Sequence, residues 1–157
     1  MATTINSVSD LQDLLGGHQV AMVSTVDERG TLSSRPVTVQ RLDDSGDLWF
    51  LVDRKADWVA PLDGSGVNAS LVDEGSTWLS FAGRGSLVSD AAVLEDLGDP
   101  MSDTYFGEGA EPVALRIVSD AVEWWTAPGK VSQTVELAKA KLTGETPDLG
   151  DSGTLQV

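Results

Sequence analysis

The sequence has no cysteine and a single histidine, His18. The lack of cysteine excludes disulfides and thiolate metal sites, and one histidine excludes a histidine-rich metal site. No apolar run approaches the roughly 18 residues that a membrane-spanning helix needs. The amino-terminal residues lack the basic start and the apolar centre of a signal peptide. A cytoplasmic protein without a metal site is therefore expected.

Basic residues are also scarce, with ten Lys and Arg against 25 Asp and Glu and a formal net charge of −15. General binding of DNA or RNA requires a basic surface, so nucleic acid is not an expected partner. The acidic residues are spread along the chain, which favours a role in solubility over an acidic recognition surface. Because cations are few, each becomes informative, since a phosphate site must use some of them.

Common motifs of nucleotide and hydrolytic sites are missing. No G-x-G-x-x-G follows a strand, and no Walker loop, nucleophile elbow or calcium loop occurs. The stretch Gly83–Gly85 lies inside an expected strand, where glycine marks a bulge or a close backbone approach. His18 stands beside glycines before the first expected strand and is interpreted as a turn residue. Acid–base chemistry would fall to carboxylates, lysines or Tyr105, and the spacing selects none of them.

The order of elements predicts one domain of mainly β (α+β) class, an antiparallel barrel of about six or seven strands. Helices are expected at 7–17, capped by Ser7 or Ser9, at 54–62, at 90–98, capped by Asp90, and at 131–145. Strands are expected at 20–27, 31–42, 48–53, 66–73, 76–90 and 113–127, mostly joined as hairpins, with the last one bent or divided at Ser119–Asp120.

Two tryptophans are adjacent in the last expected strand. Side chains of consecutive strand residues point to opposite faces, so only one of Trp124 and Trp125 can face the core. The other then faces solvent, a dimer partner or a flat aromatic ligand, and partly covered surface is the plainest of these alternatives.

Three cations lie in or directly after expected strands. Arg35 lies in a strand beside Pro36, while Arg54 and Lys55 follow another strand and open the helix expected at 54–62. Free N–H groups and the positive dipole end of a helix suit a phosphate. The alternative is that these cations pair with neighbouring aspartates.

A series of stretches resembles a known family in their order along the chain, from about Leu11 to Gly150. They include "AMVSTVDERGTLSSRPVTVQ", "GDLWFLVDRKADWV", "WLSFAGRGSLV", "LRIVSDAVEWWTAPGKV" and "ELAKAKLTGETPDLG". Together they resemble the general stress protein 26 family of the pyridoxamine 5′-phosphate oxidase-like flavoproteins. The resemblance implies a split β-barrel over residues 1–157, with about 145–157 as a carboxyl-terminal tail. It also implies a homodimer that holds FMN, or FAD, between its subunits.

The resemblance also implies a set of site residues. Arg35 would contact the flavin phosphate, and the backbone of 36–38 would lie along the isoalloxazine ring. The phosphate site would be completed after the third strand, and a tryptophan would reach the flavin from the other subunit. The positions concerned are Arg35, Pro36, Val37, Thr38, Val52, Asp53, Arg54, Lys55 and Trp125.

One position departs from the family pattern. Where the family usually has a lysine after the third strand, as a second phosphate cation, this sequence has Trp58. No second basic cluster is present for a substrate phosphate, so the resemblance does not extend to pyridoxamine phosphate oxidation.

Two functions stay open. The first is an FMN-binding, stress-associated flavoprotein with flavin-dependent oxidoreductase chemistry. The second is a dimeric barrel that has lost or weakened FMN binding and serves as a binding or scaffold module. FAD, a deazaflavin or haem are alternative ligands, and haem is least expected because strong axial ligands are few.

Overall fold

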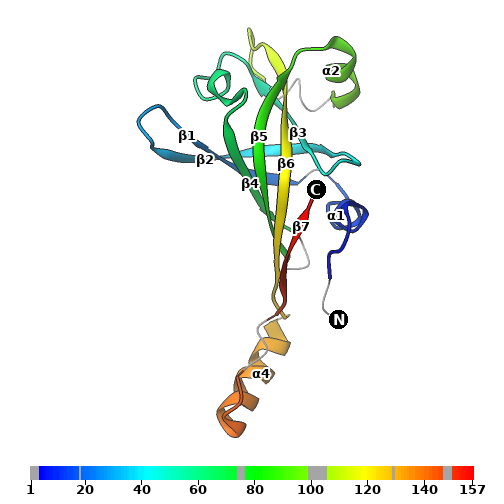
Figure 1. Ribbon diagram of the computed structural model, residues 1–157, viewed down its shortest axis with the longest axis vertical. Coiled ribbons are helices and arrows are strands. Elements are labelled where there is room, and N and C mark those ends of the chain that lie inside the picture. The colour runs from blue at the N-terminus through cyan, green and yellow to red at the C-terminus, as the bar shows by residue number, and fades with distance from the viewer. Residues whose placement is uncertain (1–3, 18, 74–76, 99–105, 129, 147–149) are drawn as a thin grey trace.

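The residues described by the computed structural model are 4–17, 19–73, 77–98, 106–128, 130–146 and 150–157, with backbone alone for 130–136. They contain seven strands and four helical segments (Figure 1). The strands are β1 (Val20–Val26), β2 (Leu32–Leu42), β3 (Leu48–Asp53), β4 (Gly66–Val72), β5 (Thr77–Val88), β6 (Pro112–Thr126) and β7 (Ser152–Gln156). The helical segments are α1 (Val8–Leu14), the 3₁₀ helix η1 (Ala60–Leu62), α2 (Ala91–Leu97) and α4 (Lys130–Thr143).

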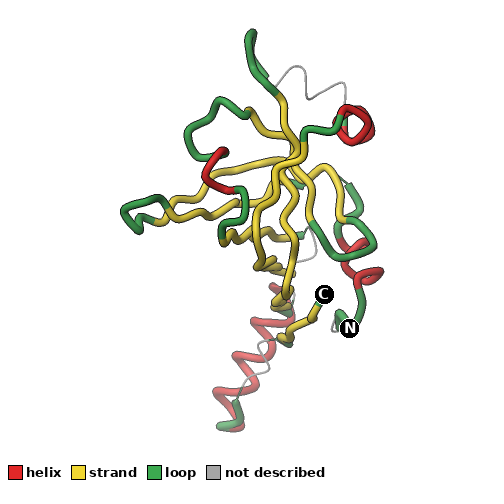
Figure 2. Tube along the Cα trace, turned by 45° about the horizontal axis from the view of Figure 1, so that its top comes forward, coloured by secondary structure: helices red, strands yellow, loops and turns green. Residues whose placement is uncertain are grey.

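The strands form a barrel in the order β3-β2-β1-β4-β5-β6, which β3 closes by pairing with β6, and β7 is added beyond β6 (Figure 2). One edge of β6 is shared, because β3 pairs with residues 112–117 and β7 with residues 121–125. β5 runs along the other edge. The predicted mainly β barrel of antiparallel strands is confirmed.

Side chains alternate between the two faces of each strand, and one face of every strand points into the barrel, where the core lies. In β1, Ala21 and Val23 are fully buried while Val20 and Met22 face outward. Phe50, Phe81 and Ile117 fill the interior from three other strands. α1 covers this core with Leu11 and Leu15, and its first turn is closed by Ser7, which accepts a hydrogen bond from the backbone N–H of Asp10.

The glycines of β5 permit close approach, as predicted. A Cβ at Gly83 would collide with the backbone carbonyl of Val118, and the β5–β6 register shifts between Ala82 and Gly83. Asp120 is the extra residue on β6, since Ala82 pairs with Ala121 and Gly83 with Ser119. The segment 112–126 is therefore one long strand that contains a bulge.

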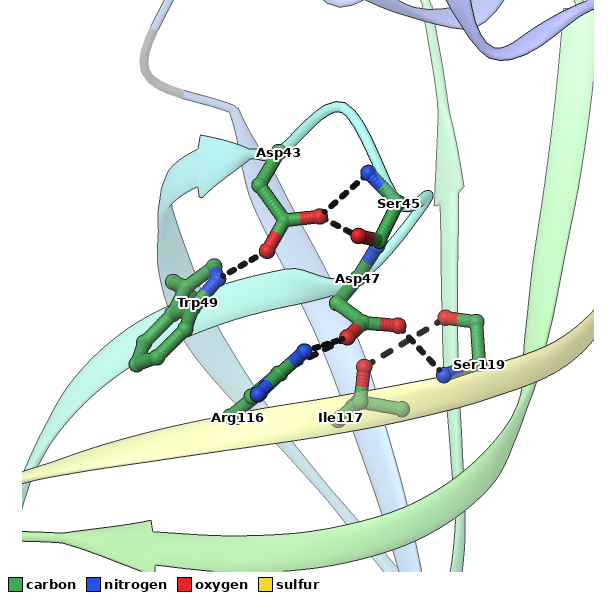
Figure 3. Close-up of polar contacts among 7 residues, drawn as sticks. All are labelled: Asp43, Ser45, Asp47, Trp49, Arg116, Ile117 and Ser119. Atoms are coloured by element: carbon green, nitrogen blue, oxygen red, sulfur yellow. Dashed lines mark hydrogen bonds and ion pairs between the residues drawn. The ribbon is translucent and has the colours of Figure 1, made fainter. Parts of the chain in front are cut away.

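A polar network joins β3 to β6 near this bulge (Figure 3). Oδ2 of the buried Asp47 accepts a hydrogen bond from Nε of Arg116 at 2.7 Å and forms an ion pair with Nη2 at 2.6 Å. Its Oδ1 accepts from the backbone N–H of Ser119 at 2.9 Å. The neighbouring Asp43 accepts a bond from Nε1 of Trp49 at 2.8 Å. These contacts link the start of β3 to the middle of β6, where the barrel closes.

Three sequence expectations need correction. The α-helix expected at 54–62 is wrong, because this segment forms successive turns and ends in η1. The side chain of Asp53 accepts the backbone N–H of Lys55, and i→i+3 bonds reach Ala56, Val59 and Leu62. Such bonds bring residues three apart to one face, so that Val59 and Leu62 are both buried, and this imitates helical spacing.

The second correction concerns the expected tail at about 145–157, which contains β7. β7 contains more polar than apolar residues, so its sequence has little strand pattern. It forms because it pairs with a free edge of β6. Third, the helix expected at 131–145 is α4 at Lys130–Thr143, and it does not cover the core, because Leu137 and Leu142 are exposed. In Figure 1, α4 projects from the lower end of the barrel.

Candidate functional site: a pocket at the end of strand β3

A pocket of about 290 Å³ opens where β2, the end of β3 and the turns after β3 meet residues 106–110. This volume is near the lower end of the range for small-molecule sites. The lining is mainly apolar and includes two aromatic rings. Its residues are Pro36, Val37, Leu51, Val52, Asp53, Ala56, Trp58, Phe106, Gly107 and Ala110.

Asp53 organises the polar edge of this pocket. Its Oδ1 accepts hydrogen bonds from the backbone N–H groups of Lys55 (3.0 Å) and Glu111 (3.1 Å). The bond from Lys55 is the main cause, and that from Glu111 the second, of a pKa below the usual value of 3.8 for Asp53. At neutral pH the pocket is therefore lined by an ionised carboxylate.

Trp58 and Arg35 meet beside the same pocket. The Cζ atom of Arg35 lies 4.5 Å from the centre of the Trp58 ring, a cation–π contact. Nη1 of Arg35 also donates a hydrogen bond to Oγ1 of Thr25 at 2.9 Å. Trp58 packs against the core and lines the pocket. Two contacts thus hold the Arg35 side chain against the protein.

The other two cations are directed at protein partners. Nζ of Lys55 donates to the carbonyl of Gly109 at 2.6 Å and lies 3.7 Å from Oε1 of Glu111. Arg54 donates through Nη2 to the hydroxyl of Ser89. Both connect the turn after β3 to neighbouring segments through a carbonyl, a glutamate and a serine, and not through the neighbouring aspartates that the sequence suggested.

Trp125 lies on a different surface, which we call the outer apolar face and define by Val20, Met22, Val72, Trp78 and Trp125. These residues line an open hollow of about 620 Å³ over β1, β4, β5 and β6. Trp78 pairs directly with Trp125 across the β5–β6 ladder, and the side chains are 46% and 43% exposed. The adjacent Trp124 is buried. The predicted division of the tryptophan pair between core and surface is confirmed.

The two surfaces are neighbours around the barrel. Met22 of the outer apolar face pairs with Pro36 of the pocket, and Val20 pairs with Thr38. Trp125 on β6 is four strands away from β2 along the sheet, a distance of roughly 19 Å. Thr38 of β2 borders the outer apolar face, because it pairs with Val20.

Sequence reasoning found half of the pocket. Five of its predicted residues, Pro36, Val37, Val52, Asp53 and Trp58, line the pocket together. Arg35 contacts its wall, whereas Thr38, Arg54, Lys55 and Trp125 are not among the lining residues. The missed residues are Leu51, Ala56, Phe106, Gly107 and Ala110, of which the last three lie between α2 and β6. His18 and Tyr105 lie outside the described residues.

The described part of the chain contains no group of His, Asp and Glu residues arranged to hold a metal ion. Nor does it contain a helix long and apolar enough to cross a membrane.

Comparison with solved structures identifies the fold. A protein described as general stress protein 26 from Jannaschia sp. CCS1 is 23% identical, with a TM-score of 0.69, and the match covers 95% of this chain and 99% of that one. A general stress FMN/FAD binding protein from Xanthomonas citri is 25% identical, with a TM-score of 0.58 and coverage of 69% and 80%. A heme binding protein from Mycobacterium smegmatis is 13% identical, with a TM-score of 0.61 and coverage of 81% and 57%.

No curated protein is similar enough to the chain to count as a match. The model of the family described as pyridoxamine 5′-phosphate oxidase like, in contrast, matches residues 6–148. That span contains β1 to β6 and every residue that lines the pocket. The chain therefore belongs to the pyridoxamine 5′-phosphate oxidase-like family.

Proposed function

We propose that this protein is a cytoplasmic, stress-associated flavoprotein that binds the isoalloxazine ring of a flavin in the pocket at the end of β3. The observation that carries the proposal is the meeting of Pro36, Val37, Val52, Asp53 and Trp58 around one pocket. The resemblance assigns Pro36 and Val37 to the isoalloxazine ring and Val52 and Asp53 to the phosphate site, and Trp58 takes the position of a phosphate lysine. A relative from Xanthomonas citri that is described as an FMN/FAD binding protein supports the same class of ligand.

The chemistry of the walls suits a flat aromatic ring. Pro36 and Phe106 offer flat ring surfaces, and Leu51 and Val52 make this part of the lining apolar. A bound flavin would supply the electron transfer, while this chain would bind and orient it. FMN is the cofactor that the resemblance predicts, with FAD as the alternative, and oxidoreductase activity follows as a proposal.

We propose further that the active form is a homodimer joined through the outer apolar face. Val20 is 57% exposed and Trp78 is 46% exposed, which is unusual for side chains of this size on a monomer with a net charge of −15. A two-fold interface brings the same patch of both copies together. Because Met22 pairs with Pro36 at the border of the patch, such a dimer would bring Trp125 of one copy towards the pocket of the other.

The experiment is a visible absorption spectrum of the purified protein, followed by titration with riboflavin, FMN and FAD. Uptake of a flavin would appear as quenching of its fluorescence and as a shift of its visible absorption band when the protein is present. Arg35→Ala should weaken uptake, because it removes the cation stacked on Trp58. A colourless protein that takes up none of the three flavins would contradict the proposed function and favour the scaffold alternative.

A further inference from the structure

The charges around the pocket are unusual for a site that would hold a phosphate. Recognition of a phosphate depends on Arg, Lys or free backbone N–H groups, which form charge-assisted hydrogen bonds with its oxygens. Among the ten residues that line the pocket, Asp53 alone is charged, and its charge is negative. The lowered pKa of its carboxyl keeps it ionised at neutral pH.

The backbone donors of the turn after β3 are already used. The N–H of Arg54 donates to the carbonyl of Glu111 at 2.8 Å, and that of Ala56 to the carbonyl of Asp53 at 3.0 Å. The N–H of Lys55 donates to the carboxylate of Asp53. Since this segment is a series of turns and not a helix, it has no set of free N–H groups at its start.

The side-chain cations nearby are also engaged. Lys55 is held by the carbonyl of Gly109 and by Glu111, Arg54 by Ser89, and Arg35 by the Trp58 ring and Thr25. A phosphate that recruited one of them would break its present contacts. The other seven Lys and Arg residues lie elsewhere in the chain, at Arg29, Arg41, Arg84, Arg116, Lys130, Lys139 and Lys141.

We propose that the pocket selects a flavin without a phosphate, of the riboflavin class, over the phosphorylated flavins FMN and FAD. The inference rests on the proposed function, because it concerns the same site and the same ring. A phosphate placed beside Asp53 would lose hydration, would gain Lys55 as a partner only by drawing it from Gly109 and Glu111, and would be repelled by the carboxylate. A ribityl chain carries only hydroxyl groups, which do not suffer this repulsion.

The test compares riboflavin and FMN as ligands of the wild-type protein by quenching of flavin fluorescence. We expect riboflavin to bind at least about tenfold more tightly than FMN, because the phosphate of FMN loses hydration beside Asp53 and is repelled by its carboxylate. Added salt should lower the ratio of riboflavin affinity to FMN affinity, because it screens the repulsion between the phosphate of FMN and Asp53. The affinity for riboflavin itself should stay nearly constant. FMN binding as tight as riboflavin, or tighter, would overturn the inference and leave the proposed function standing. Binding of neither flavin would overturn both.

A pair of variants tests where the discrimination arises. Trp58→Lys places a cation at the pocket wall, and Trp58→Gln removes the same ring without adding charge. The FMN-to-riboflavin affinity ratio should rise by about tenfold or more in Trp58→Lys relative to Trp58→Gln. Equal ratios in the two variants would contradict a phosphate position beside Trp58 and overturn the inference.

Trp58 also packs against the core, so its replacement threatens folding as well as ligand binding. A second pair of variants is therefore made at Ala110. Ala110 lines the pocket from the opposite segment and is only partly buried. Ala110→Lys should raise the same affinity ratio relative to Ala110→Gln. Circular dichroism and thermal unfolding establish which variants keep the barrel, and the ratio is measured on those.

Discussion

The guanidinium of Arg35 stacks on the indole ring of Trp58, with 4.5 Å between Cζ and the ring centre. This contact gives Arg35 a partner within the chain, and Trp58 also lines the pocket. The ring therefore holds this arginine at the pocket wall.

This contact predicts a measurable coupling between the two residues. In a double-mutant cycle of Arg35→Ala and Trp58→Leu, we expect a coupling free energy of about 0.5–1 kcal/mol, typical of a partly exposed cation–π pair. The measurement is the unfolding free energy from urea titrations. The hydrogen bond of Arg35 to Thr25 should not enter the coupling, because it is lost equally in both arms of the cycle. Additive effects would show that the stacking contributes nothing.

The outer apolar face predicts that Trp125 controls assembly. Trp125→Ser should raise the dimer dissociation constant by more than about 30-fold, as expected for a tryptophan hot spot worth at least about 2 kcal/mol. Light scattering after size-exclusion chromatography over a range of concentrations measures this. Leu142→Ser is the matched control, since Leu142 is 87% exposed on α4 and outside the patch. A wild-type protein that stays monomeric throughout would refute the homodimer.

The Asp47–Arg116 pair predicts a large loss of stability when one partner is removed. Asp47 is 3% exposed and also accepts the N–H of Ser119. Asp47→Ala should lower the unfolding free energy by about 2–3 kcal/mol, less than for a fully buried pair because Arg116 keeps access to water. Asp96→Ala breaks the exposed contact with Arg41 and should cost about 0–1 kcal/mol. Equal losses of unfolding free energy in the two variants would contradict a special contribution of the Asp47–Arg116 pair, which links β3 to β6.

Asp43 predicts a pH-dependent contribution to stability. Burial acts to raise its pKa, but hydrogen bonds from Trp49, Asp47 and Ser45 outweigh burial, and the pKa lies below 3.8. A carboxyl with a lowered pKa in the folded state stabilises it above about pH 4, and this stabilisation is lost as the pH falls through the folded pKa. The difference in Tm between wild type and Asp43→Asn should therefore be largest at pH 7 and shrink below pH 3.8. A difference that is constant from pH 7 to pH 3 would contradict this.

Local patterns were sufficient for the strands of the barrel. Alternation of buried and exposed residues in β1, and the hairpin turns, follow from side-chain direction in a strand and from turn chemistry, both of which are local. The capping of α1 by Ser7 and of α2 by Asp90 was also visible, because a cap depends on residues within one turn. β7 was missed because it pairs with a free edge of β6 and carries little apolar pattern of its own.

The sequence by itself determined the family, the mainly β class and the positions of five pocket residues, since these depend on the order of residues along the chain. Only the tertiary structure decided which partners the cations take. Lys55 bonds to Gly109 and Arg35 stacks on Trp58, and the first of these pairs lies 54 positions apart in sequence. Long flexible side chains reach whichever acceptor folding brings near, so their direction cannot be read from neighbours in the chain. For the same reason the pocket carries a carboxylate where the sequence suggested a cationic site.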